Sequence, residues 1–150
     1  MSTTTGASAF PLSYAEGMAE EMDQEVLEFA RRCFDLAREG GAEQLAQYVD
    51  AGLPPNLTNE KGDTLLILAA YHNHPETVKV LVERGAELDR ANDRGQTALT
   101  AAVFRQDADT VNILLAGGAD PNAGGPSAVE MAKFFDLPEM LALLEPAQPS

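Results

Sequence analysis

The residues of this 150-residue chain best suited to metal binding or nucleophilic catalysis are one cysteine and two histidines. His72 and His74 lie two positions apart, so on a helix their side chains point to different faces. Neither a Cys-x-x-Cys nor a His-x-x-x-His pair occurs, and the distance to Cys33 matches no recognisable ligand spacing. Cys33 also falls at an apolar position, which favours a place in the core. These residues predict neither a metal site nor a catalytic nucleophile.

Other catalytic arrangements are also missing from the sequence. None of the carboxylates is marked by the apolar setting that prepares an acid or a base for catalysis. The glycine pairs Gly117-Gly118 and Gly124-Gly125 do not precede a helix in the manner of a phosphate-binding loop. We therefore expect a protein that is not an enzyme and that uses no cofactor.

The charge balance excludes several classes of partner. The chain carries 24 acidic and 10 basic residues, for a formal net charge of -14, so it repels both nucleic acid and anionic lipid. No run of 18 apolar residues is present to span a membrane. A single cysteine fits a reducing compartment. These features predict a cytoplasmic protein whose partner is neither nucleic acid nor a membrane.

A period of 33 residues organises the chain. The matching pairs are Gly62/Gly95, Thr64/Thr97, Leu66/Leu99, Ala69/Ala102, Val78/Val111, Leu81/Leu114 and Gly85/Gly118. After a deletion of three residues the register resumes, with Ser127 matching Thr97 and Leu144 matching Leu114. Such self-similarity is typical of a tandem array of stacked units.

Each unit of the array predicts two short helices and a polar, hairpin-like connection. The first helix is expected over 65–72, 98–105 and 128–135, each after a hydroxyl residue that can cap it: Thr64, Thr97 and Ser127. A proline suits the first turn of the second helix in two units, at Pro75 and Pro138. The glycines at Gly62 and Gly95 allow the positive φ of the turn before the first helix.

Two segments carry a motif that can be compared with known repeats. They read Gly62-Asp-Thr-Leu-Leu-Ile-Leu-Ala-Ala70 and Gly95-Gln-Thr-Ala-Leu-Thr-Ala-Ala-Val103, and one repeat ends in Gly118-Ala-Asp-Pro-Asn122. On these motifs, residues 59–123 resemble the ankyrin repeat family. The family's Thr-Pro-Leu-His is replaced by Thr64-Leu-Leu-Ile67 and Thr97-Ala-Leu-Thr100. We therefore expect altered hydrogen bonding where these helices begin. The resemblance also implies a structural role for His74 between two helices.

The predicted fold is an all-α ankyrin repeat solenoid of about four helix-turn-helix repeats, with short hairpin-like loops and an N-terminal capping helix. The repeats are expected at about 30–58, 59–91, 92–123 and 124–146, within a single domain over 13–146. Apolar residues from Met18 to Ala37 recur at mostly helical spacing, and predict a helix that continues into the first repeat. Ser13 and Glu16 could form a capping box near its start. Residues 1–12 and 147–150 are expected to be disordered tails.

The resemblance implies a concave binding face, formed by the hairpin tips and the exposed side of each first helix. Tyr71, Phe104 and Phe134 occupy one equivalent position in three repeats and would align into an aromatic ladder. Aromatic residues and arginine are enriched at binding hot spots. An alternative role for these rings is to buttress neighbouring repeats. The complete predicted binding set is Arg38, Lys61, Asp63, Tyr71, His72, Arg94, Gln96, Phe104, Arg105 and Phe134.

These inferences predict a non-catalytic protein–protein interaction module, itself a monomer, that binds a folded protein. It would serve as an adaptor, an inhibitor or an immunity-like partner. A structural, self-associating acidic scaffold is one alternative, and mimicry of nucleic acid by the acidic surface toward a basic protein is another. A hidden metal or enzyme site at His72 and His74 is a third.

Overall fold

The computed structural model of the chain describes residues 19–145, with side chains from residue 24 onward. The predicted capping box at Ser13 and Glu16, the side chains of Met18 and Met22, and both predicted tails lie outside the described residues.

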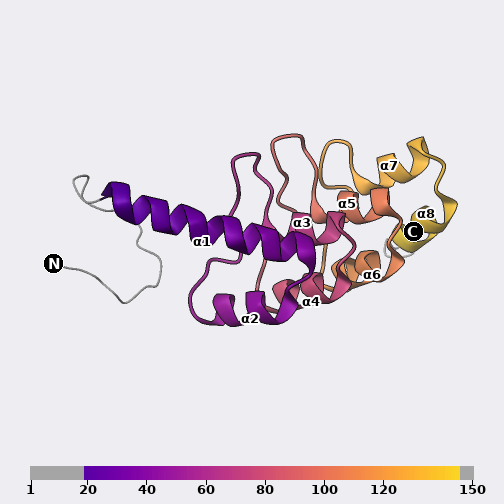
Figure 1. Cartoon of the computed structure of the whole chain (residues 1–150). Helices are drawn as coiled ribbons and strands as arrows, with labels where there is room; N and C mark the ends of the chain where they lie inside the picture. The colour runs from indigo at the N-terminus through magenta and orange to yellow at the C-terminus, as the bar shows by residue number, and fades with distance from the viewer. Residues whose placement is uncertain (1–18, 146–150) are drawn as a thin grey trace.

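Within that range the chain forms eight helices in four consecutive pairs (Figure 1). They are α1 (Ala19–Glu39), α2 (Ala42–Asp50), α3 (Leu65–Tyr71), α4 (Pro75–Glu83), α5 (Ala98–Arg105), α6 (Ala108–Ala116), α7 (Ala128–Phe134) and α8 (Pro138–Leu144). The first helices α1, α3, α5 and α7 pack in sequence to make one layer, and α2, α4, α6 and α8 make the other. This arrangement confirms the predicted all-α solenoid with an N-terminal helix.

Helices α3, α5 and α7 begin directly after the predicted hydroxyl residues. The Thr64 hydroxyl accepts a hydrogen bond from the Ile67 amide at 3.0 Å. At the start of α5, Thr97 and Thr100 each accept from the other's backbone amide, at 3.1 and 2.9 Å. Thr100 stands where the family motif has its histidine, so its hydroxyl supplies the second bond at the helix start. Ile67 has no polar group for this purpose, and α3 begins with the Thr64 cap alone.

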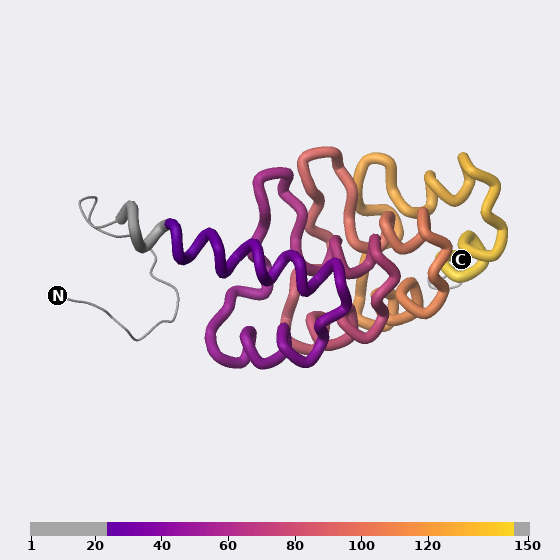
Figure 2. The backbone as a smooth tube through the Cα atoms, viewed as in Figure 1, coloured from indigo at the N-terminus to yellow at the C-terminus, as the bar shows by residue number. Residues whose placement is uncertain are grey.

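The hairpin loops stand side by side along one edge of the solenoid (Figure 2). Their tips are joined through the backbone: the Asp93 amide donates to the Lys61 carbonyl, and the Gly125 amide to the Gly95 carbonyl, both at 3.0 Å. Gly95 has a φ of +81°, and a Cβ there would lie 2.7 Å from the Gly125 carbonyl oxygen. Only glycine therefore permits both the turn and the close approach of the next loop.

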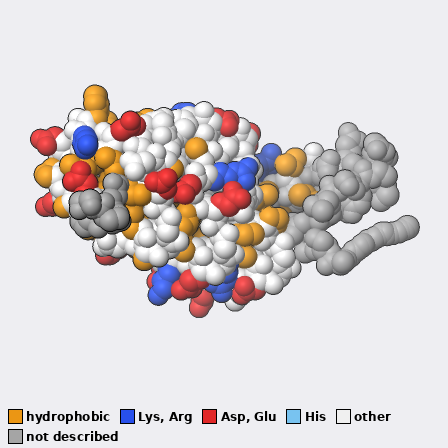
Figure 3. Space-filling model, turned by 180° about the vertical axis from the view of Figure 1, so that it is seen from behind, with side chains coloured by type: hydrophobic (Ala, Val, Ile, Leu, Met, Phe, Trp, Pro, Cys, Tyr) orange, Lys and Arg blue, Asp and Glu red, His pale blue; other side chains and the backbone are white. Residues whose placement is uncertain are grey.

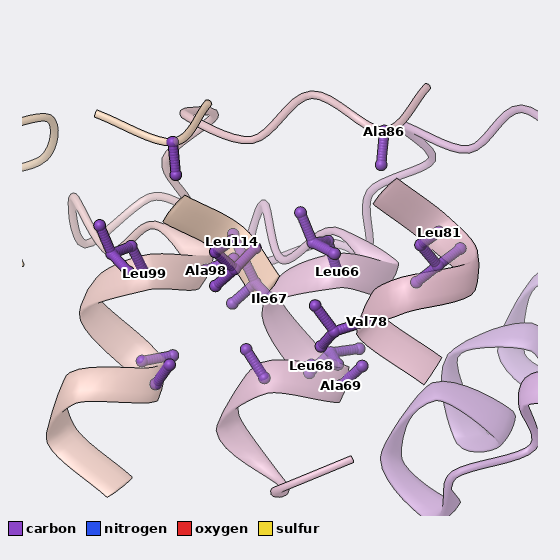
Figure 4. Packing of buried hydrophobic residues seen from close by; sticks show 14 of the residues in the cluster. Leu66, Ile67, Leu68, Ala69, Val78, Leu81, Ala86, Ala98, Leu99 and Leu114 are labelled. Carbon is purple, nitrogen blue, oxygen red and sulfur yellow. The ribbon is translucent and has the colours of Figure 1, made fainter. Parts of the chain in front are cut away.

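The core lies between the two layers of helices. Figure 4 shows Leu66 of α3, Leu81 of α4 and Leu99 of α5 directed into this space, and all three are almost fully buried. Cys33 of α1 is fully buried in the same cluster, as predicted. Burial raises the pKa of its thiol to about 11, against a smaller lowering effect from Arg32. The thiol is consequently protonated at neutral pH and is not a nucleophile.

One pair of equivalent threonines differs in its hydrogen bonding. Thr77 of α4 and Thr110 of α6 are both buried. The Thr110 hydroxyl donates to the carboxylate of Asp107, the residue that caps α6, at 2.8 Å. In α4 the capping position is taken by His74, whose Nε2 instead donates to the Arg38 carbonyl at 2.7 Å. The Thr77 hydroxyl is left without a partner among the described residues.

This difference predicts opposite effects for two identical substitutions. Thr77→Val should raise the free energy of unfolding by about 1 kcal/mol, because it removes an unsatisfied buried hydroxyl. Thr110→Val should lower it by about 1.5 kcal/mol, because it removes a hydrogen bond to a charged acceptor. Urea denaturation followed by circular dichroism measures both. Equal destabilisation by the two substitutions would show that the Thr77 hydroxyl is bonded.

Candidate partner-binding groove

A groove of about 600 Å³ is lined by the first helices α1, α3 and α5, by two hairpin tips and by Met131 of α7. Eight of the ten predicted binding residues line it: Arg38, Lys61, Asp63, Tyr71, His72, Arg94, Gln96 and Phe104. Arg105 and Phe134 do not. Ile67, Leu68 and Ala101 add an apolar surface between the charged residues. The groove therefore combines apolar, aromatic and charged groups within one concavity.

Two aromatic rings form the centre of the predicted ladder. Tyr71 and Phe104 are stacked, with ring centroids 6.2 Å apart and planes inclined by 9°. The Arg105 guanidinium carbon lies 5.4 Å from the centroid of the Tyr71 ring, in the range of a cation–π contact. The rings are still 39% and 49% exposed. They therefore support each other and at the same time present apolar surface to solvent.

The third ring of the ladder is Phe135 and not the predicted Phe134. The Phe135 centroid lies 6.4 Å from that of Phe104 and 5.0 Å from that of Phe134. Phe134 is 81% exposed, at the end of α7. One residue turns a helical side chain by about 100°. Phe135 caps the C-terminal end of α7, and from there its ring, rather than that of Phe134, lies against Phe104 of the neighbouring helix α5.

Two of the predicted polar residues hold the groove wall together. The carboxylate of Asp63 accepts a hydrogen bond from the Asn92 side-chain amide at 2.7 Å, and the Gln96 side-chain oxygen accepts from the same amide at 2.9 Å. The bond to Asp63, which is buried, ties one hairpin to the next, and the bond to Gln96 holds Asn92 within its own hairpin. Lys61 and Arg94, in contrast, are exposed at the tips. Asp63 and Gln96 thus position the wall, while the two cations are available for contact.

Comparison with known proteins agrees with this architecture. A family model described as "Ankyrin repeats (3 copies)" matches residues 34–124. The chain belongs to the ankyrin repeat family. Ankyrin repeats generally mediate protein–protein interaction, and the family is typically non-catalytic.

Two curated relatives match parts of the ankyrin array. A Pseudomonas aeruginosa protein named for its ankyrin repeats is 53% identical over 60 residues, which cover 40% of this chain and 35% of the relative. An ankyrin repeat-containing protein of Schizosaccharomyces pombe is 33% identical over 52 residues, which cover 35% of this chain and 25% of the relative. The match therefore spans about a third of the length of the Pseudomonas aeruginosa relative and a quarter of that of the Schizosaccharomyces pombe relative.

The ankyrin groove also contains residues that the sequence analysis missed. Arg31, Phe34 and Asp35 of α1 line it together with Arg38. From Arg31 to Arg38 these four residues are separated by three, one and three positions, so they lie on one face of a helix. This spacing can be recognised in the sequence. The ankyrin motif is weak in the first repeat, so only the end of its first helix was assigned to the binding face.

Two other kinds of site do not occur in the described part of the ankyrin domain. No group of three or more His, Cys, Asp or Glu side chains among the described residues is placed to hold a metal ion. No helix in the described part of the chain is long and apolar enough to cross a bilayer.

His72 lies in the groove beside the aromatic stack, and the pKa of its ring is lowered. Desolvation by burial lowers the pKa of its ring from the ordinary value of 6.5, and the positive charges of Arg38, His74 and Arg105 lower it further. The ring is therefore neutral at pH 7. A neutral imidazole can donate and accept hydrogen bonds at the edge of the aromatic stack.

Removing one of these charges should raise the pKa of His72. In Arg38→Gln the protonated ring loses an unfavourable neighbour, so the pKa should move up toward 6.5. Nuclear magnetic resonance titration of the His72 ring protons measures the shift. Arg84→Gln is the control, because Arg84 pairs with Asp50 and is not among the charges that act on His72. A pKa that stayed constant or fell in Arg38→Gln would contradict this electrostatic account.

Proposed function

We propose that this chain is a non-catalytic binding module that docks its groove onto a folded partner protein, as an adaptor, an inhibitor or an immunity-like partner. The observation that carries the proposal is the exposed stack of Tyr71 and Phe104 within the groove. Large aromatic side chains left in contact with water on a folded surface commonly mark an interaction site. Membership of the ankyrin family supports the same interpretation.

The rings could supply a substantial part of the binding free energy. Tyr71 is 39% and Phe104 49% exposed, which corresponds to roughly 80 Å² of apolar surface per side chain. At about 25 cal/mol per Å², covering both rings would contribute about 4 kcal/mol. A contribution of this size is enough to make the two rings the centre of an interface.

The acidic composition gives less support to nucleic-acid mimicry. Mimicry requires a continuous run of negative charge that resembles a phosphate backbone. On the face shown in Figure 3, the Asp and Glu side chains lie in small groups, several of them beside Lys or Arg. This face therefore does not favour the mimicry alternative.

The proposal predicts that truncating both rings abolishes capture of the partner. The wild-type chain and Tyr71→Ala/Phe104→Ala would be used as baits in lysate of the native host, and the captured proteins identified by mass spectrometry. At least tenfold less of the specific protein should be recovered with the double variant, because about 4 kcal/mol of apolar burial is removed.

Leu27→Ala is the matched control for that experiment. Leu27 is 51% exposed on α1 and does not line the groove, so this truncation should leave capture unchanged. Circular dichroism would verify that each variant keeps its helices. Equal capture by the wild type and the double variant would show that the groove is not the binding face. Sedimentation of the purified chain would test self-association, which the proposal expects to be absent.

A further inference from the structure

The groove differs in charge from the rest of the molecule. Four of the 10 basic residues line it: Arg31, Arg38, Lys61 and Arg94. Only three of the 24 acidic residues do so: Asp35, Glu60 and Asp63. A chain with a net charge of -14 thus has a groove in which positive charges outnumber negative ones. Because the charge of the groove is opposite in sign to that of the whole chain, we expect its ligand to carry negative charge.

Most of the carboxylates in the groove already have partners. Asp35 forms an ion pair with Arg38 at 2.9 Å, and Asp63 is held by the Asn92 amide at 2.7 Å. Glu60 is the remaining acidic residue of the lining. Three cations, Arg31, Lys61 and Arg94, form no ion pair with any carboxylate of the described chain. Beyond the Arg38–Asp35 pair, three cations therefore share the groove with two carboxylates, Glu60 and Asp63, and Asp63 is buried.

The repeat register explains where two of these cations stand. Lys61 and Arg94 each precede a turn glycine, Gly62 or Gly95, and so occupy equivalent positions on adjacent tips. The backbone bond from the Asp93 amide to the Lys61 carbonyl keeps the tips together. Arg31 lies on the helical side of the groove, in α1. Arg31, Lys61 and Arg94 therefore line the same groove as the exposed rings of Tyr71 and Phe104.

We propose that the groove binds an acidic segment of the partner protein. The carboxylates of this segment would pair with Arg31, Lys61 and Arg94, while an apolar or aromatic side chain of the same segment packs on Tyr71 and Phe104. This inference rests on the proposed function, because it names the chemistry of the surface that the module recognises. Charge complementarity selects an acidic occupant over a basic one, although the chain as a whole is acidic.

A random peptide library can test this assignment while the partner is still unidentified. A phage-displayed library of 12-residue peptides would be selected on the immobilised full chain at 0.1 M salt. The enriched peptides should carry a net negative charge and at least one aromatic or large aliphatic residue. Their affinity should fall by about tenfold on Arg31→Gln/Lys61→Gln/Arg94→Gln, because three exposed ion pairs are lost.

A second triple variant controls for the overall charge. Arg32→Gln/Lys79→Gln/Arg90→Gln removes the same residue types from positions that do not line the groove, and it lowers the net charge by the same amount. Affinity for the selected peptides should stay within twofold on this variant. Enrichment of neutral or basic peptides, an absence of enrichment, or equal losses on the two triple variants would overturn the assignment.

The Tyr71→Ala/Phe104→Ala variant separates this inference from the proposed function. If the enriched peptides are neutral or basic and still require the two rings, the groove is a binding site and only the acidic chemistry is wrong. If the enriched peptides bind both the ring variant and the Arg31→Gln/Lys61→Gln/Arg94→Gln variant as well as the wild type, the groove is not the binding site and both proposals fail.

Discussion

Each helix pair of this chain has an apolar side that would face water if the pair stood alone, so the fold depends on stacking one pair against the next. Helix α3 illustrates this dependence: its residues from Leu65 to Ala70 are all buried, because α1 and α5 both pack against it. Alanines such as Ala69 and Ala102 allow this close approach. The same stacking fixes the distance between the ends of the first helices. The 6.2 Å separation of Tyr71 and Phe104 is therefore a consequence of core packing.

The three-residue deletion in the last unit limits how far the binding surface extends. By register, Gly124 stands in the fourth repeat where Arg94 stands in the third. Its loop therefore offers no cation at the equivalent position. The fourth repeat contributes Met131 to the groove lining, and its Phe135 ring lies against Phe104. Most of the groove lining consequently comes from the first three repeats.

The sequence predicted the helices closely because their boundaries depend on local signals. Thr64, Thr97 and Ser127 each bond to a backbone amide three residues later, so spacing alone locates the start of a helix. The assignment of His74 to a structural role was also correct, since it bonds to the Arg38 carbonyl.

The misses involve contacts that depend on neighbours far away in the sequence. The choice between Phe134 and Phe135 is decided by which ring meets Phe104. The unsatisfied hydroxyl of Thr77 depends on the direction in which His74 turns. Neither of these two features can be predicted from a short stretch of sequence. Arg31, in contrast, could have been predicted from the helical spacing of its neighbours. It was missed because the ankyrin motif is weak in the first repeat.

The groove is held on both sides by bonds that exist before any partner arrives. On the hairpin side, the backbone bonds from Asp93 to Lys61 and from Gly125 to Gly95 join successive tips. On the helical side, His74 attaches the end of α1 to the start of α4. Ordering a mobile side chain on binding typically costs about 0.5–1.5 kcal/mol in conformational entropy. A groove whose backbone is already fixed avoids part of that loss. It would therefore discriminate among partners by the spacing of their groups, and would not reshape itself to fit them.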